Sequence, residues 1–335
     1  MINMEVVEPL VSIVIPTRHR PDLVVRAVRS ALNQTLQAIE LIVIVDGPDE
    51  ETIAALGEIQ DSRLRIKAMP DNLGPAEARN AGVRESRCQW VAFLDHDDEW
   101  LPEKLEIQLQ FARKCTHQYP IIGCRLIVRY EKRDLVWPKR FPRPNEPMSD
   151  YLFCRTQFFG GEGNLQTSMI FTARALLQIV PFTKESQSHD DIDWVLRATM
   201  LPGAEVQFVP KSAPLAIWHR DDTRSTISSK TNWRFSLEWV NQNRGLFTKR
   251  AYASFLMTWV SANAIQEGDR KESLLLLRHA YRYGKPSVFD VILFWGIWLF
   301  PPKMRAQMAF LFTGKRPFNP NMSFNRASFP TRPYP

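Results

Sequence analysis

Short apolar runs alternate with amphipathic segments along the first 115 residues of the chain. Val11–Ile15, Leu41–Val45 and Trp90–Leu94 are almost wholly apolar and run into polar residues, a pattern typical of buried strands. Helical spacing of apolar residues and helix-start signals predict helices over Pro21–Leu32, Asp49–Leu56, Pro75–Arg84 and Pro102–Arg113. One more strand is predicted over Leu64–Ala68. Strands that alternate with helices predict βαβ units and therefore a parallel sheet.

The pattern is more mixed beyond residue 115. It predicts strands over Ile121–Tyr130 and Ser168–Phe171, with a glycine-rich loop at Gly160–Asn164 between them. A helix is predicted over Asp191–Met200, and further helices are predicted over residues 233–282. We therefore expect a domain over residues 1–230, with halves of about 1–115 and 116–230, and a helical C-terminal extension over 231–335.

Polar residues follow three of the predicted strands at the point where each strand ends. Pro16–Arg18 follow the first strand, Asp46 the second, and Asp95–Asp98 the last. Ligands of parallel sheets bind beyond the carboxyl ends of the strands, so these segments should converge on one crevice. Carboxylates crowded there are costly to desolvate, and a bound cation would relieve that cost. A second acidic cluster is Asp190–Asp193, so the sequence offers one acidic cluster for a metal and another for a base.

The composition is that of a folded protein in a reducing compartment. With 44% hydrophobic and 24% charged residues, the chain is not of the disordered class. Its four cysteines form no Cys-x-x-Cys pair, which argues against a disulfide framework and against a zinc site. The N-terminus is too polar and acidic for a signal peptide, so a cytoplasmic location is expected.

The C-terminal residues combine positive charge with a strongly apolar segment. Residues 270–335 hold eleven Lys/Arg and two Asp/Glu, a net charge of +9, whereas the whole chain carries +7. The apolar run Val288–Phe300 has 13 residues and contains Asp290, but a helix needs about 20 residues to span a bilayer. With Trp295 and Trp298, this run could lie peripherally in the interface of an anionic membrane, at the inner face of the cell membrane. The alternatives are a core helix for the run and a solvated tail for the charge.

Sequence motifs narrow the class of function. The sequence has no P-loop, no His-Glu-x-x-His, no Gly-x-Ser-x-Gly, and no Gly-x-Gly-x-x-Gly after the first strand. These absences disfavour P-loop NTPases, zincins, α/β-hydrolases and dinucleotide-binding domains. Six segments, in this order, resemble the motifs of the family 2 glycosyltransferases: Val11–Thr17, Val28–Gln34, Leu41–Gly47, Asn72–Gly82, Phe93–Pro102 and Asp190–Arg197.

The resemblance implies a fold and a reaction. The fold is the GT-A fold of nucleotide-diphospho-sugar transferases, an α/β architecture whose mostly parallel sheet is flanked by helices. The reaction is inverting transfer of a sugar from a nucleotide-diphosphate sugar to a glycan or a lipid-linked acceptor, in polysaccharide biosynthesis.

The resemblance also implies which residues serve the donor. Contacts to the nucleotide sugar are expected from Pro16, Thr17, Arg18, Asp46, Arg79 and Asp95. Asp97, with Asp95 as its partner, would hold Mg²⁺ or Mn²⁺, because a hard divalent cation shared by carboxylates and phosphates neutralises a leaving diphosphate. Asp98 and Glu99 are expected to cap the following helix.

Inverting transfer needs one base to take the proton of the acceptor hydroxyl, and Asp191 aligns with that base. Asp190, Trp194 and His219 are candidates for further contacts with donor or acceptor. A place in the core is the alternative for Trp194, and a structural role is the alternative for His219.

Two other functions are compatible with parts of this pattern. One is a nucleotidyltransferase of related architecture, although the glycine-rich signature that it needs after the first strand is absent. The other is a non-enzymatic, peripheral membrane-binding module that uses the basic tail. No aromatic platform of the RNA-binding kind occurs, so nucleic acid is not an expected partner.

Overall fold

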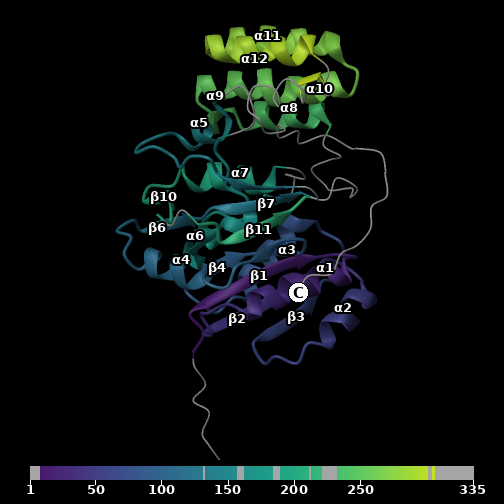
Figure 1. Cartoon of the computed structure of the whole chain (residues 1–335), viewed down its shortest axis with the longest axis vertical. Coiled ribbons are helices and arrows are strands. Elements are labelled where there is room, and N and C mark those ends of the chain that lie inside the picture. Colours follow the sequence, from purple (N-terminus) through teal and green to yellow (C-terminus); the bar gives the residue numbers. More distant parts are fainter. Residues whose placement is uncertain are drawn as a thin grey trace, which may run out of the picture.

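The computed structural model describes residues 8–130, 133–156, 162–183, 189–210, 213–220, 232–300 and 304–305. A seven-stranded sheet, flanked by helices, forms its centre (Figure 1). In spatial order its strands are β10 (Ala204–Phe208), β6 (Tyr119–Gly123), β9 (Phe171–Ala173), β4 (Trp90–Phe93), β1 (Val11–Thr17), β2 (Ile39–Val45) and β3 (Leu64–Ala68). All neighbouring strands are parallel except β9, which is antiparallel to both β4 and β6. The predicted α/β fold with a mostly parallel sheet is therefore confirmed.

Helices connect the parallel strands in the first half of the chain. They are α1 (Pro21–Leu32), α2 (Glu50–Gly57), α3 (Pro75–Glu85) and α4 (Lys104–Ala112). Helix α1 buries Val24, Ala27, Val28 and Ala31, which share one helical face. Every residue of β1 and β2 is buried, as expected for strands covered on both faces.

A second, four-stranded sheet lies beside the first. Its strands, in spatial order, are β5 (Glu99–Trp100), β11 (Ala216–His219), β7 (Leu126–Tyr130) and β8 (Arg133–Trp137). The strand predicted over Ile121–Tyr130 is thus two strands in two sheets. The Gly123 carbonyl accepts from the Val209 N–H, whereas the Arg125 carbonyl accepts from the Leu215 N–H, so the chain leaves one sheet for the other at this point. An apolar run does not reveal such a change of partner.

The strand predicted over Ser168–Phe171 is also different in the structure. A 3₁₀ turn, η1 (Thr167–Met169), comes first, and β9 begins only at Phe171. The predicted glycine-rich loop lies partly outside the described residues, because the description resumes at residue 162.

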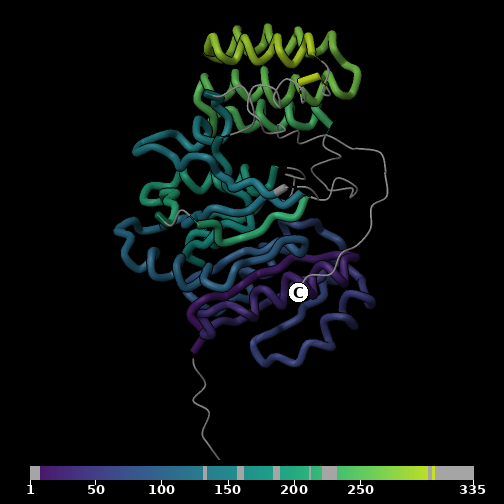
Figure 2. The backbone as a smooth tube through the Cα atoms, viewed as in Figure 1, coloured from purple at the N-terminus to yellow at the C-terminus, as the bar shows by residue number. Residues whose placement is uncertain are grey.

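Helices α5 (Met148–Phe153), α6 (Arg174–Ile179) and α7 (Asp190–Ala198) complete the part before residue 230. The C-terminal region consists of α8 (Trp233–Gln242), η3 (Arg244–Leu246), α9 (Lys249–Ser254), the π-helical η4 (Phe255–Val260), α10 (Ser261–Gln266), α11 (Arg270–Tyr283) and α12 (Val288–Leu299). These helices form layers at one end of the molecule, with α11 and α12 outermost (Figures 1 and 2).

The apolar segment predicted near the C-terminus forms α12, which is neither wholly buried nor wholly exposed. Asp290 and Phe294 are fully buried, and α12 packs on η4 and α10. On another face, Val288 is 78% and Leu299 is 57% exposed. Among the described residues, none of the helices combines the length and apolar character that crossing a bilayer requires.

Candidate active site

The carboxyl end of β2 is joined to the start of α3. The two carboxylate oxygens of Asp46 accept hydrogen bonds from the N–H groups of Leu73 (2.8 Å) and Gly74 (2.9 Å). The Asp46 N–H donates to the Thr17 carbonyl at 2.9 Å, so the end of β1 belongs to the same unit. Gly47 has φ +97°, and a Cβ there would come within 3.1 Å of the turn before α3, which explains why a glycine follows Asp46.

The last residues of β1, with Arg18 after them, lie next to the acidic turn that follows β4. Thr17 is buried, and its hydroxyl has no hydrogen-bond partner among the described residues. The Pro16 carbonyl accepts from His96 Nδ1 at 3.3 Å, which brings the two strand ends together. Arg18 is half-buried and forms no hydrogen bond or ion pair with the described residues. A buried hydroxyl beside an unpaired cation is what a binding position for a polar, anionic ligand would provide.

Asp98 is the buried member of the acidic turn. Its Oδ2 accepts hydrogen bonds from Ser168 Oγ (2.6 Å) and from Gln166 Nε2 (3.1 Å). The Asp95 N–H donates to the same Ser168 hydroxyl at 3.1 Å. Burial, reinforced by the charges of Asp97 and Asp95, raises the pKa of Asp98 well above its usual value. Asp98 therefore holds the shape of the turn from inside.

The prediction that Asp98 and Glu99 cap the following helix is wrong. Helix α4 begins at Lys104, and its N-cap residue is Glu103, whose side chain makes no cap hydrogen bond. The Leu105 N–H in the first turn instead donates to Gln34 Oε1 at 3.1 Å. Glu99 instead lies in β5, and Asp98 is occupied by its contacts with η1. The short strand β5, which sequence analysis missed, separates the acidic turn from the helix.

Asp97 is the acidic residue of this turn that remains available. Its side chain is half-buried, and its carboxylate has no hydrogen bond or ion pair within the described part of the chain. Its main chain, by contrast, is fixed, because Arg26 Nη2 donates to the Asp97 carbonyl at 2.6 Å. A fixed backbone with an unpaired carboxylate fits a ligand-binding position.

Arg79 joins the two acidic clusters that sequence analysis treated separately. It lies in α3 and is 5% exposed. Its Nη2 donates to Asp95 Oδ1 at 2.8 Å, and its Nη1 donates to Asp190 Oδ2. Burial alone would lower the pKa of Arg79, but the Asp190 and Asp95 carboxylates raise it, so the guanidinium stays charged. The first turn of α7 is thereby held against the end of β4.

Asp191 lies beside this bridge without a cation of its own. Its Oδ1 accepts from the Ile192 N–H at 2.7 Å, at the start of α7. Burial, reinforced by the neighbouring Asp190 carboxylate, raises the pKa of Asp191 to about 7. A carboxyl that changes charge near neutral pH is suited to accept and release a proton.

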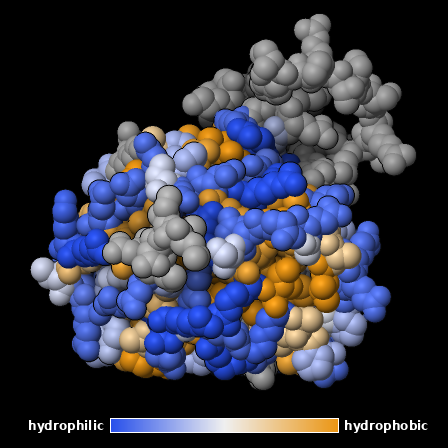
Figure 3. All heavy atoms as spheres, turned by 90° about the horizontal axis from the view of Figure 1, so that it is seen from below, coloured by the Kyte–Doolittle hydropathy of each residue, from blue (hydrophilic) through white to orange (hydrophobic). Residues whose placement is uncertain are grey.

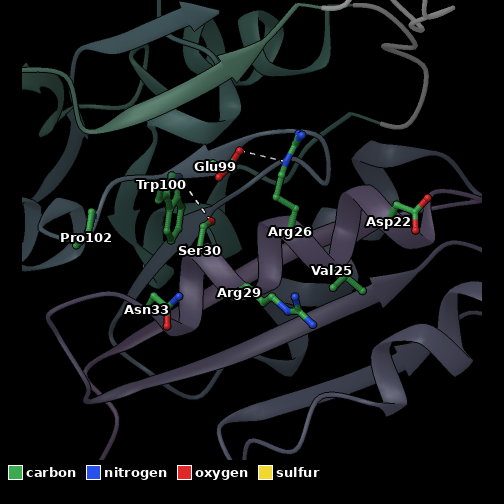
Figure 4. A pocket seen from close by; sticks show the side chains of 9 residues that line it. All are labelled: Asp22, Val25, Arg26, Arg29, Ser30, Asn33, Glu99, Trp100 and Pro102. Carbon is green, nitrogen blue, oxygen red and sulfur yellow. Dashed lines mark hydrogen bonds and ion pairs between the residues drawn. The ribbon is translucent and has the colours of Figure 1, made fainter. Parts of the chain in front are cut away.

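His219, at the end of β11, is linked to the acidic turn through Glu99. Its Nε2 lies 2.6 Å from Glu99 Oε1, and Glu99 Oε1 also lies 3.2 Å from Arg26 Nε. A cavity of about 400 Å³ lies between α1 and β5, and Figure 4 shows Arg26 reaching along it toward Glu99. The partner of His219 is therefore Glu99, which fits a structural role. Arg26 contacts both Glu99 and the Asp97 carbonyl, so this group lies close to Asp97.

Trp194 does not belong to the site, which corrects its candidacy as a donor or acceptor contact. Its side chain is 0% exposed and stacks on Phe182 with ring centroids 5.4 Å apart. Its indole N–H donates to the Val180 carbonyl at 2.7 Å, so its polar group is satisfied inside the core. A residue without accessible surface cannot stack on a sugar in this structure.

Several residues that build the site were missed from the sequence. Ser168 and Gln166 support Asp98, and Arg26 fixes the backbone of Asp97. His189 precedes α7 and is buried. None of these four residues stands in a spacing that indicates its partner, because each contact joins elements far apart in the chain.

The residues present fit a divalent cation that a diphosphate would share. No group of three or more His, Cys, Asp or Glu that could hold a metal ion occurs within the described residues. Asp97 and Asp95 nevertheless offer unpaired carboxylate oxygens two residues apart, and Mg²⁺ is commonly held by one or two carboxylates plus substrate phosphates. These two residues would hold the ion.

Comparison with known proteins identifies relatives of part of the chain. Residues 12–177 match Glycosyl transferase family 2. A glycosyltransferase of Haemophilus influenzae is 40% identical over 105 residues, which is 31% of this chain and 42% of that protein. The succinoglycan biosynthesis protein ExoO of Rhizobium meliloti is 38% identical over 104 residues, 31% of this chain and 30% of ExoO. The chain thus matches less than half the length of these relatives.

Two further similarities extend over more of the chain. The amylovoran biosynthesis glycosyltransferase AmsB of Erwinia amylovora is 25% identical over 245 residues, 71% of this chain and 79% of AmsB. The crystal structure of S. aureus TarS 1-349 in complex with UDP-GlcNAc aligns with a TM-score of 0.54 and 15% identity, over 81% of this chain and 79% of TarS 1-349. At 15% identity, the similarity to TarS 1-349 concerns the fold alone.

Proposed function

The chain belongs to glycosyl transferase family 2, and we propose that it transfers one sugar, with inversion, from a nucleotide-diphosphate sugar to a hydroxyl of a glycan or lipid-linked acceptor. One observation carries this proposal. Two acidic groups with different environments lie on either side of Arg79, which contacts both Asp95 and Asp190. On one side, the Asp97 carboxylate has no partner among the described residues. On the other side, burial and Asp190 raise the pKa of Asp191 to about 7.

Asp191 is the proposed base. Inverting transfer is an in-line attack in which the acceptor hydroxyl loses a proton as it bonds to the anomeric carbon. A carboxylate with a pKa near the working pH combines a useful ionised fraction with enough basicity to take that proton. The Arg79–Asp190 contact keeps the first turn of α7 beside the donor end of the sheet, where the attack would occur.

Asp97 and Asp95 are the proposed holders of Mg²⁺ or Mn²⁺ and of the donor diphosphate. When bound, the ion would supply positive charge against the diphosphate that leaves. Thr17 and Arg18, at the end of β1, would bind the nucleotide, with Pro16 and Asp46 lining the base. Support comes from the buried, unpartnered Thr17 hydroxyl and from the Asp46 contacts that fix the turn before α3.

The donor and acceptor classes are proposed from the relatives. TarS was crystallised with UDP-GlcNAc and with UDP, which makes a UDP-sugar the first donor to test. AmsB and ExoO act in the biosynthesis of amylovoran and succinoglycan, which favours a growing polysaccharide as the acceptor.

A thermal-shift screen of UDP-, GDP- and dTDP-sugars, with and without Mn²⁺, tests the donor and the metal together. We expect one nucleotide class to stabilise the protein in a Mn²⁺-dependent manner, because a ligand that binds only the folded state raises its stability. No stabilisation by any nucleotide sugar would refute the proposal. The anomeric configuration of the product, read by NMR, tests inversion.

The two acidic residues are then tested by isosteric substitution. Asp97→Asn and Asp191→Asn should each lower transfer by at least about a hundredfold while the protein remains folded. Asp71→Asn is the matched control, since Asp71 is exposed and has no partner among the described residues. Full activity in either of the first two variants would remove that residue from its role.

The proposed location is the cytoplasmic face of an anionic membrane, with the outer face of α11 and α12 as the contact surface. Val288, Ile292, Trp295 and Leu299 are exposed and follow one another at helical spacing. Arg278, Arg282 and Lys285, which are exposed on or just after α11, would attract anionic headgroups. Figure 3 shows the molecule from below, where hydrophilic residues surround an apolar area.

Vesicle flotation tests this surface. The protein should float with phosphatidylcholine vesicles that contain phosphatidylglycerol, and Ile292→Asp should weaken binding by about tenfold or more. Ile179→Asp is the matched control, because Ile179 on α6 is 51% exposed and Ile292 is 49% exposed. Equal binding by the two variants, or no binding by the unmodified protein, would refute the membrane contact.

A further inference from the structure

The N-terminal turn of α7 is held from two sides. On the side of the central sheet, Arg79 donates to Asp190. On the other side, the turn contacts α8, a helix of the C-terminal region about 40 residues further along the chain. In the sequence, Asp191 stands between Asp190 and Asp193, which take part in these two attachments.

Hydrogen bonds and ring contacts join the start of α7 to α8. His189 Nε2 is hydrogen-bonded to Ser236 Oγ at 2.9 Å, and the His189 ring lies 4.6 Å from the Trp239 ring, centroid to centroid. Trp239 Nε1 donates to Asp193 Oδ1 at 3.2 Å. His189, Trp239 and Asp193 are all buried, so water does not compete for these contacts.

The spacing of the contacts makes them one attachment. His189 and Asp193 are four residues apart, and the Asp193 N–H donates to the His189 carbonyl at 2.7 Å, so both lie on one side of the first turn. Ser236 and Trp239 are three residues apart on α8, which also places them on one face. A shift of α8 would therefore move the first turn of α7 as a unit, and Asp191 with it.

Asp193 remains satisfied without the tryptophan. Its Oδ2 also accepts from Thr183 Oγ1 (3.0 Å) and from Arg197 Nε (2.7 Å). Loss of the indole N–H alone would therefore leave a hydrogen-bonded carboxylate and an intact helix. What it would remove is the link from that helix to α8.

We propose that α8 positions the proposed base: Trp239 through Asp193, and Ser236 through His189, hold the first turn of α7 so that Asp191 faces the acceptor hydroxyl. This inference rests on the proposed function, in which Asp191 is the base. Trp239 and Ser236 are positioning residues that do not touch the substrate. A displacement of about 1 Å at a reacting group can cost about a hundredfold in rate, so small movements of this turn matter.

The test compares two Trp→Phe variants in the same aromatic cluster. Trp239→Phe keeps a buried ring but removes the N–H that donates to Asp193. Trp259→Phe is the matched control. Its ring centroid lies 6.2 Å from that of His189, but its indole N–H is buried and has no hydrogen-bond partner among the described residues. The two changes remove the same atoms, and only one breaks the link to α7.

We expect Trp239→Phe to lower kcat by about tenfold with KM for the nucleotide sugar changed by less than about twofold, because the donor end of the site is untouched. Trp259→Phe should leave both parameters near those of the unmodified protein. Hydrogen–deuterium exchange should become faster over residues 189–193 in Trp239→Phe and not in Trp259→Phe. If Trp239→Phe misfolds, Ser236→Ala replaces it, with a smaller loss of kcat expected.

The outcomes separate this inference from the proposed function. Equal kcat values for the two tryptophan variants, or a fall in kcat accompanied by an equal loss of donor binding, would overturn the positioning role while Asp191 could still be the base. If the unmodified protein turns over none of the screened nucleotide sugars, starting with UDP-GlcNAc, or if Asp191→Asn keeps full activity, the proposed function fails and the inference fails with it.

Discussion

Replacing Asp191 by asparagine should stabilise the protein above neutral pH while it lowers transfer by at least about a hundredfold. Burial and the Asp190 carboxylate raise the pKa of Asp191 from 3.8 to about 7. Between these two values the folded protein holds a proton that the unfolded chain releases, so folding becomes less favourable as the pH rises from about 4 to about 7. Above that range the cost of burying the Asp191 carboxylate is constant. Asparagine carries no charge, so the variant does not have this cost.

The pKa shift sets the size of the effect. A shift of about three units corresponds to about 4 kcal/mol of unfolding free energy at most. Because the Asp191 side chain is only partly buried, solvent screening should reduce the gain to about 2 kcal/mol at pH 8. In a protein of this size that would raise the melting temperature by about 3–6 °C. At pH 4.5 the gain should fall to about a quarter of its value at pH 8, because Asp191 is then protonated when folded and only partly ionised when unfolded.

Urea unfolding of the unmodified protein and of Asp191→Asn, at pH 4.5 and pH 8, measures this difference. Asp71→Asn is the control, since Asp71 is exposed and its substitution should change stability by less than about 0.5 kcal/mol at either pH. A gain in Asp191→Asn that is the same at both pH values, or a loss of stability at pH 8, would show that Asp191 is not a carboxyl strained by burial.

Three other substitutions test the remaining contacts of the site. Arg79→Met should lower the free energy of unfolding by about 3 kcal/mol, measured in urea, because Asp190 and Asp95 lose the cation they share. Asp46→Asn should cost about 1–2 kcal/mol and weaken UDP binding in calorimetry, since an amide cannot accept from both N–H groups of the turn before α3. Asp97→Asn should keep the melting temperature within about 2 °C, because its carboxylate has no partner among the described residues, yet should lose the Mn²⁺-dependent part of the thermal shift.

The first half of the fold could be predicted from the sequence because each element carries its own signal. Pro21–Leu32 and Leu64–Ala68 have the bounds that their patterns predicted. In β1 and β2 every residue is buried, so an unbroken apolar run suffices to mark the strand. In the second half, β6 and β7 follow one another within a single apolar run. Their assignment to two sheets depends on which distant strands they meet, and local periodicity does not encode that.

The site could be predicted in part, where its residues carry a local sequence signal. Acidic residues that directly follow a buried strand must lie at its carboxyl end, so Asp95 and Asp97 could be placed from the sequence. Trp194 shows the limit, because an aromatic residue near a site can face the core or the ligand, and only the packing on Phe182 decides between them. The link from Trp239 to Asp193 spans 46 residues and had no sequence signal.

The acidic turn shows how burial gives different roles to identical side chains. In the sequence, Asp95, Asp97 and Asp98 are the same carboxylate within four positions. In the structure, Asp98 takes the donors of η1 and is buried, Asp95 shares one oxygen with Arg79, and Asp97 keeps its carboxylate unpaired. Burial keeps a ligand from Asp98, although its Oδ1 has no hydrogen-bond partner among the described residues. The half-buried Asp97, beside a second acid, gains most from a cation. The same argument applies to Asp191: its burial raises its pKa, so a proton relieves the cost of that burial, and that is the property a base requires.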